Sequence, residues 1–227
     1  MRSLGTVKAL FRYPVKSMAG ERLDEVDLGW YGVDGDRRFA FRREQDPSGF
    51  PWLTAGKLPT LVTYQPVAGK QVITPGGETL ALDGEPLRME LSALHGSEVR
   101  VMHLRQGVFD EAPLSLISTA TIDALSEAAG RPLDIRRFRP NILIETETPF
   151  LEDSWVGKIV SFGTARMAVT NKDLRCGMIN FDPDSAETDP VILKAVVRTR
   201  DNWAGIYGSV LQRGRTALGD AIYVAES

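Results

Sequence analysis

The chain contains one cysteine and two histidines in 227 residues. A single thiol forms neither an intramolecular disulfide nor a thiolate zinc or iron–sulfur cluster, because each of these needs two or more thiols. His95 and His103 have no neighbouring metal-binding motif, so neither predicts a metal site. Three roles remain for Cys176: a single soft ligand, a nucleophile, or a buried inert thiol.

Several familiar signatures are also missing. There is neither a Gly-x-Gly-x-x-Gly motif nor a phosphate loop, which argues against the nucleotide-binding folds that carry them. Ser115 and Ser118 lack the Gly-x-Ser-x-Gly context of a serine hydrolase. The acidic stretch 182–189 lacks the central glycine and distal glutamate of an EF-hand, so we interpret it as a turn with a helix cap.

No apolar segment suits a secretory signal, and no run reaches the roughly 18 apolar residues of a membrane span. The net charge of −3 gives no general attraction to nucleic acid or to anionic membranes. One unpaired cysteine fits a reducing compartment. We therefore expect a soluble, cytoplasmic protein that binds no nucleic acid and no membrane.

Short strands separated by turns dominate the pattern. No helical periodicity is evident in the first hundred residues, and 75–78 predicts a hairpin turn. A helix is expected from a cap at Ser118 or Thr119 to Gly130, and a second from Asp189 to about Arg198. The expected strands are 6–11, 23–28, 37–42, 61–65, 71–74, 79–82, 141–145, 158–162, 165–170, 206–211 and 220–224.

This pattern predicts an α+β fold that is mostly β, with a barrel-like core. The 43% hydrophobic content is enough for a substantial core. A soft domain boundary is expected within 103–113.

Three basic segments are candidates for binding an anion. If 136–141 is extended, Arg137, Arg139 and Asn141 share one side, and this donor set suits a phosphorylated heteroaromatic cofactor. Lys16 and Ser17 lie in a loop where they can hold a phosphate, and Arg38 can reach the same anion. The alternatives are a solvated strand with surface ion pairs and ordinary turns with exposed cations.

The surroundings of Cys176 are also cationic. Arg175 and Lys172 favour the thiolate, which is the form that ligates soft metals. The alternative is an inert buried thiol, because cysteine is among the most frequently buried residue types. Residue chemistry alone leaves both interpretations open.

Taken in order, these segments resemble the MOSC family, named for the C-terminal domain of the molybdenum-cofactor sulfurase. Tyr13-Pro-Val-Lys-Ser17 and Gly35-Asp-Arg-Arg-Phe39 resemble the N-terminal β-barrel domain of that family. The resemblance to its core domain rests on Arg137-Phe-Arg-Pro-Asn141, Glu152-Asp-Ser-Trp155, Arg175-Cys176 and Asp182-Pro183. The amidoxime-reducing component and its bacterial counterparts are especially similar. The resemblance implies an N-terminal β-barrel-like domain at 1–105 and a MOSC-type β-barrel core with a few flanking helices at 106–227.

The resemblance also implies a molybdenum cofactor, molybdenum bound to molybdopterin. Cys176 would ligate the metal, and the dithiolene of the cofactor supplies two further sulfurs, so that one protein thiolate suffices. Residues that would line the pterin and its phosphate are Lys16, Ser17, Arg38, Arg139 and Asn141, with Arg137 and Arg175 as additions. Neither an iron–sulfur cluster in this chain nor pyridoxal phosphate is expected.

The activity implied is oxidoreductase: reduction of N-hydroxylated small molecules such as amidoximes and hydroxylamines. With one cysteine in the chain, the electrons would come from a separate ferredoxin-, flavoprotein- or cytochrome-like donor protein. Two non-redox alternatives stay open, a sulfur carrier with a persulfide on Cys176 and a module that binds or transfers the cofactor.

Overall fold

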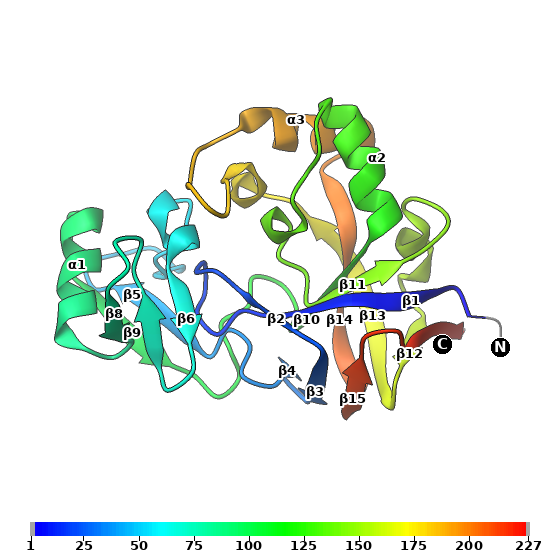
Figure 1. The fold of residues 1–227 in the computed structure, drawn as a ribbon, viewed down its shortest axis with the longest axis horizontal. Coiled ribbons are helices and arrows are strands. Elements are labelled where there is room, and N and C mark those ends of the chain that lie inside the picture. Colours follow the sequence, from blue (N-terminus) through cyan, green and yellow to red (C-terminus); the bar gives the residue numbers. More distant parts are fainter. Residues whose placement is uncertain (1–2, 226–227) are drawn as a thin grey trace.

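The computed structural model describes residues 3–225, and within them the centre of the molecule is a closed β-barrel (Figure 1). Its strands follow the order β11-β10-β14-β13-β12-β16-β1, and pairing between β1 and β11 closes the ring. Within the barrel as described for residues 3–225, β10 and β11 pair in parallel, and the other neighbouring strands are antiparallel. The barrel strands are β1 Gly5–Arg12, β10 Leu114–Ser118, β11 Ile142–Glu145, β12 Ile159–Phe162, β13 Ala165–Leu174, β14 Trp203–Gln212 and β16 Ala221–Ala225.

The interior of the barrel is apolar. Alternate residues of β13 point inward, so that Ala165, Met167 and Val169 are buried beside Trp155 and Ile206. Complete burial of one large apolar side chain contributes about 1.5–3 kcal/mol, so this core accounts for much of the stability of the barrel. The prediction of a mostly-β fold with a barrel core is confirmed.

Two helices cover one side of the barrel, and both are the predicted ones. Helix α2, Thr119–Ala129, begins where the Ser118 hydroxyl accepts the Thr121 N–H, and it ends at Gly130 with φ 71°. Helix α3, Pro190–Arg200, begins at the carboxylate of Asp189 and packs against α2. Three short 3-10 helices complete this part: η2 Ile135–Arg137, η3 Leu151–Trp155 and η4 Gly177–Asn180.

The remaining elements form a lobe beside the barrel, drawn at the left of Figure 1, and a small sheet below. The lobe has its own core, which includes Val15, Met18 and Leu61. Strand β2, Glu21–Leu23, extends the barrel sheet by pairing with β1. The elements of the lobe and of the small sheet are β3 Glu25–Gly29, β4 Gly32–Val33, β5 Phe39–Arg43, η1 Pro59–Thr63, β6 Gln65–Val67, β7 Gln71–Ile73, β8 Thr79–Ala81, α1 Glu85–His95, β9 Val99–His103 and β15 Gly214–Ala217.

Two predictions for the first hundred residues are wrong. Helix α1 was not expected, yet Leu87 and Leu91, one turn apart, are buried on its inner face, and Pro86 and Gly96 suit its two ends. The expected strand at 61–65 is largely the 3-10 helix η1, in which the adjacent Leu61 and Val62 are both buried. Strands β4, β9, β10 and β15 also lie outside the predicted set. All five residues of β10 are buried, so alternation is absent there.

Strand β1 belongs to the barrel, although it lies in the first hundred residues. The barrel is thus built from both sides of the predicted domain boundary, whose position stays a prediction. Within residues 3–225, none of the helices has the length and apolar character needed to cross a membrane.

Candidate functional site

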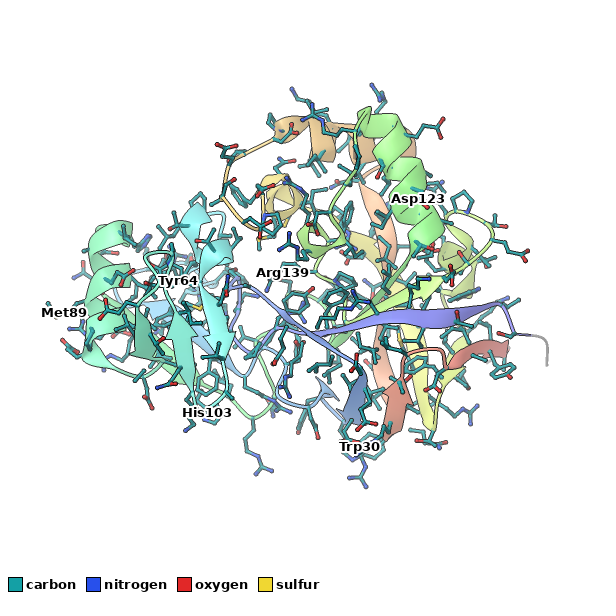
Figure 2. The ribbon with its side chains drawn as sticks, in the orientation of Figure 1. Trp30, Tyr64, Met89, His103, Asp123 and Arg139 are labelled. Carbon is teal, nitrogen blue, oxygen red and sulfur yellow. The ribbon has the colours of Figure 1, made fainter. Side chains whose placement is uncertain are left out.

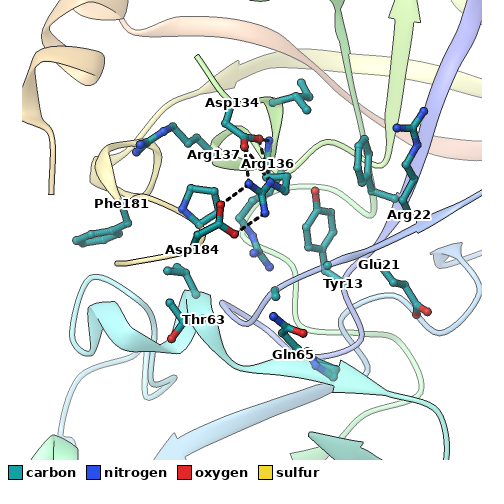
Figure 3. A pocket seen from close by; sticks show the side chains of 18 of the residues that line it. Tyr13, Glu21, Arg22, Thr63, Gln65, Asp134, Arg136, Arg137, Phe181 and Asp184 are labelled. Atoms are coloured by element: carbon teal, nitrogen blue, oxygen red, sulfur yellow. Dashed lines mark hydrogen bonds and ion pairs between the residues drawn. The ribbon is translucent and has the colours of Figure 1, made fainter. Parts of the chain in front are cut away.

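A cavity of about 600 Å³ lies between the lobe and the barrel, bounded by β6 and by the η2 and η4 turns (Figure 3). Its volume is in the range that holds a heterocyclic cofactor. At one side Arg136 pairs with Asp134 and Asp184, at 2.6 and 2.7 Å, so this arginine is neutralised. Tyr13 and Arg139 form a second polar group on the wall of the cavity.

Tyr13 follows directly after β1, and two guanidinium groups lie close to its ring. Arg139 is 4.2 Å from the ring centroid and Arg37 is 4.8 Å from it, both within cation–π range. Arg37 also donates from Nη2 to the Arg139 carbonyl oxygen at 3.2 Å, and it pairs with the fully buried Asp36. Tyr13, Arg37 and Arg139, from three separate segments, therefore form one cluster of contacts.

Two donors in this cluster have no hydrogen-bond partner among residues 3–225. These are the buried Tyr13 hydroxyl and Arg139 Nη2, whereas Arg139 Nη1 donates to the Met18 carbonyl at 2.6 Å. Within residues 3–225, Arg139 makes no ion pair. Burial lowers the pKa of Arg139 to about 10 and raises the pKa of Tyr13 to about 12. An unpaired buried donor costs about 1–3 kcal/mol, so the site favours an anionic acceptor.

The segment 136–141 is not extended, which corrects the geometry predicted for it. Residues 135–137 form η2, and Arg139 adopts a left-handed conformation with φ 51°. Arg137 and Arg139 still line the same cavity, with Arg137 Nη2 donating to Asp182 at 2.7 Å. Asn141 lies in the barrel wall instead. Its side chain accepts from the Ser115 N–H at 3.2 Å and donates to the Phe11 carbonyl at 3.3 Å.

Lys16 is close enough to Arg37 and Arg139 for their charges to affect its pKa. It is buried, and its Nζ donates to Asp110 Oδ1 at 2.7 Å and to the Val108 carbonyl at 3.3 Å. Burial, together with the charges of Arg37 and Arg139, lowers the pKa of Lys16, and Asp110 opposes this effect. Because the Asp110 side chain is 69% exposed, it can leave Lys16 for solvent. The neighbouring Ser17 is buried, with a left-handed φ of 66°.

Arg38 is directed elsewhere. Its guanidinium lies 5.9 Å from the Tyr31 ring, and it lines a separate shallow hollow with His103 and Arg105. The arginine that joins Tyr13 and Arg139 is the preceding residue, Arg37. Both arginines stand in the Gly-Asp-Arg-Arg segment, and nothing in the sequence shows which one faces inward.

Arg175 is used to hold the fold together. Its Nε donates to the Ala204 carbonyl at 2.7 Å, its Nη1 donates to the Phe138 carbonyl at 2.8 Å, and it pairs with Asp173 at 2.9 Å. Lys172 is likewise paired, with Asp153 at 3.2 Å. Both cations expected to act on the thiol therefore have carboxylate partners.

Cys176 is exposed, so the alternative of a buried inert thiol is wrong. It caps η4, whose Met178 lines the cavity, while Cys176 itself lies outside the lining. Asp173, three residues earlier, is buried, and burial raises the pKa of its carboxyl to about 6 despite the Arg175 partner. The side chain of Tyr207 opposes this rise and lowers the pKa of the Asp173 carboxyl. Sequence patterns single out neither Asp173 nor Tyr207.

The residues present fit a phosphorylated cofactor that carries its own metal. Among residues 3–225, His, Cys, Asp and Glu side chains form no group of three that can hold an ion. A soft metal at Cys176 would take its remaining ligands from its cofactor. The unpaired Arg139 and Tyr13 donors, with Arg37 and Lys16 nearby, suit an anionic group.

Fold and site together define a β-barrel protein with a cationic cavity beside an exposed thiol. Residues 92–223 match the family model described as the MOSC domain, and residues 4–112 match that of the MOSC N-terminal beta barrel domain. The chain belongs to the MOSC domain family.

Curated relatives include two kinds of protein. The molybdenum cofactor sulfurase of Danio rerio is 25% identical, over 86% of this chain and 30% of its own length. The sulfurase of Caenorhabditis elegans is 29% identical over 48% of this chain and 15% of its own length. Mitochondrial amidoxime reducing component 2 of Bos taurus is 28% identical over 50% of this chain and 37% of its own length. The chain thus spans well under half the length of these relatives.

A solved structure shares the whole fold. The YUAD protein from Bacillus subtilis superimposes with a TM-score of 0.56, covering 98% of this chain and 96% of its own, at 16% identity. This similarity extends over the barrel and the lobe together. At this identity it concerns the fold alone.

Proposed function

We propose that this protein binds a molybdenum cofactor and reduces N-hydroxylated small molecules with electrons from a separate protein. The observation that carries the proposal is the pair of unpartnered buried donors, the Tyr13 hydroxyl and Arg139 Nη2, on the wall of a 600 Å³ cavity near an exposed cysteine. Family membership supports the cofactor. The amidoxime-reducing relative supports the reaction class.

The basic residues have separate roles in this proposal. Arg139 and Tyr13 donate to the anionic group, and Arg37 adds positive charge while holding the Arg139 backbone in place. On ligand binding, the Lys16 ammonium leaves Asp110 and pairs with the anionic group of the ligand. An anionic partner therefore offsets the cost of burying this ammonium both with and without the ligand. Cys176 supplies one thiolate to the metal.

The cofactor supplies the redox chemistry, in which a hydroxylamine takes up two electrons and two protons and leaves as an amine and water. The protein contributes orientation, charge neutralisation and restricted water access. Arg139 and the Tyr13 hydroxyl fix the anionic end of the cofactor, and the cavity wall limits the ways in which it can turn. Cys176, on the η4 turn, fixes the metal end.

Elemental analysis tests the binding step. Protein made in a host that synthesises molybdopterin should contain about one molybdenum per chain, and Cys176→Ser should lose it. No molybdenum in the wild-type protein despite adequate supply would refute the proposal. A reduced dye as donor, with a hydroxylamine as acceptor, tests the reaction separately.

A second candidate function follows from the exposure of Cys176 and from the sulfurase relatives. As a sulfur carrier, the protein would hold a persulfide on Cys176 and need no redox metal. Intact-mass measurement separates the two: a gain of one sulfur on Cys176 without molybdenum favours the carrier.

A further inference from the structure

A second hollow lies on the outer face of helix α3. It measures about 310 Å³, and it is formed by Asn180, Pro190, Leu193, Lys194, Val197 and Arg198. Apolar side chains line its floor, and Val197 is 48% exposed although it lies among them. Exposed apolar surface bordered by charged groups is typical of protein interaction sites.

This hollow is close to the proposed metal ligand. Asn180 forms one of its walls and is the last residue of η4, the turn that Cys176 caps. At about 2 Å per residue, four 3-10 residues separate the two Cα atoms by only about 8–10 Å. The Asn180 side chain also accepts the Leu193 N–H at 2.9 Å, which fixes η4 against α3.

The charges around the hollow are uneven. Within residues 3–225, neither Lys194 nor Arg198 makes an ion pair, and both are exposed. Of the four acidic residues in the stretch 182–189, which leads into α3, three form ion pairs, and Glu187 forms none among residues 3–225. Asp182 pairs with Arg137 at 2.7 Å, and Asp189 pairs with Arg131 at 2.6 Å. The hollow therefore carries unneutralised positive charge beside exposed apolar surface, in a chain whose net charge is −3.

We propose that the α3 hollow is the docking surface for a small acidic electron-carrier protein. The inference rests on the proposed function, which requires electrons from a separate protein. Apolar contact over Val197 and Leu193 gives affinity, while Lys194 and Arg198 attract an acidic partner and orient it toward η4. Two successive one-electron carriers deliver the electrons that one substrate molecule consumes. A small, salt-sensitive interface is typical of such transient complexes.

Another basic and aromatic surface serves as the control. Trp30 and His103 lie along the lower edge of the molecule in Figure 2, away from α3 and η4 in Figure 1. Arg213 is there, 5.2 Å from the Trp30 ring, exposed and, within residues 3–225, without an ion pair. Arg213→Glu therefore makes the same change of charge as Lys194→Glu, at a surface away from α3, and half the change of the double variant.

The experiment titrates the cofactor-loaded full chain with three purified acidic carriers: a [2Fe–2S] ferredoxin, a flavodoxin and a soluble b-type cytochrome. Calorimetry in low and high salt measures the binding. We expect at least one carrier to bind, with affinity falling as salt rises. The double variant Lys194→Glu/Arg198→Glu should weaken this binding at least tenfold, and Arg213→Glu less than twofold.

Arg198 Nη2 donates to the Ala128 carbonyl at 2.7 Å, so its replacement can loosen the contact between α3 and α2. Lys194→Glu alone avoids that loss and should still weaken binding several-fold. The proposal is overturned if no carrier binds, if Arg213→Glu weakens binding as much as the double variant, or if Val197→Glu dissociates a homodimer in sedimentation. Dye-driven turnover is measured on the same samples. Carrier binding without any turnover would defeat the proposed reaction and leave the docking surface standing.

Discussion

Replacing Arg139 with methionine separates folding from ligand binding. In the cofactor-free protein, the guanidinium is buried without a counter-ion among residues 3–225, and burial lowers its pKa from the ordinary arginine value to about 10. The shift from the ordinary arginine pKa corresponds to at most about 3–4 kcal/mol of cost to the charged form, because 1.36 kcal/mol accompanies each pKa unit. The hydrogen bond to the Met18 carbonyl returns about 1.5–3 kcal/mol. We expect Arg139→Met to change the free energy of unfolding by no more than about 2 kcal/mol.

Cofactor binding should respond far more strongly. Loss of a charge-assisted contact inside a cavity costs about 2–5 kcal/mol, which corresponds to roughly a 30-fold or greater loss of affinity. The matched control is Arg38→Met, because Arg38 lines a separate hollow beside Tyr31. It should affect neither stability nor loading.

Urea unfolding of the cofactor-free variants measures the first quantity, and molybdenum per chain at limiting cofactor supply measures the second. Our reasoning is refuted if Arg139→Met loads as fully as the wild type, or if Arg38→Met loses cofactor to the same extent. A destabilisation of the cofactor-free protein by more than about 3 kcal/mol would show that Arg139 is a structural residue.

Three further predictions concern single side chains. The folded pKa of Asp173, about 6, lies above its ordinary value of 3.8, so the folded state binds the extra proton and stability falls as pH rises between these values. In Asp173→Asn, the free energy of unfolding measured with urea should fall by up to about 3 kcal/mol less between pH 4 and pH 7 than in the wild type; parallel curves for variant and wild type would contradict this. Ser118→Ala should lower the unfolding free energy by about 1 kcal/mol, since it removes the cap of α2, whereas Thr119→Ala should change it little. Asp110→Asn should raise cofactor retention during dialysis several-fold, because Lys16 then has no carboxylate to exchange for the ligand; equal retention would mean that Asp110 does not compete.

Much of the fold follows from local patterns. The cap at Ser118, the Asp189-Pro190 start of α3 and the alternation in β13 each have a local physical cause, so they can be predicted without a structure. Local patterns predict helix α1 and strand β10 poorly. The first has short, weak periodicity next to turn residues, and the second is buried on both faces and shows no alternation.

The candidate site also has features that the sequence predicts and features that only the tertiary structure determines. The sequence alone established the inventory: one thiol, a Lys-Ser loop and two arginine-rich segments, with too few thiols for any cysteine cluster. The tertiary structure decided their roles. It turned Arg37 toward Tyr13 and Arg38 away from it, placed Asn141 and Arg175 in structural hydrogen bonds, and left the Arg139 and Tyr13 donors unpaired. Residue types fix which interactions are possible, but burial and direction depend on contacts between segments a hundred residues apart, which no local pattern encodes.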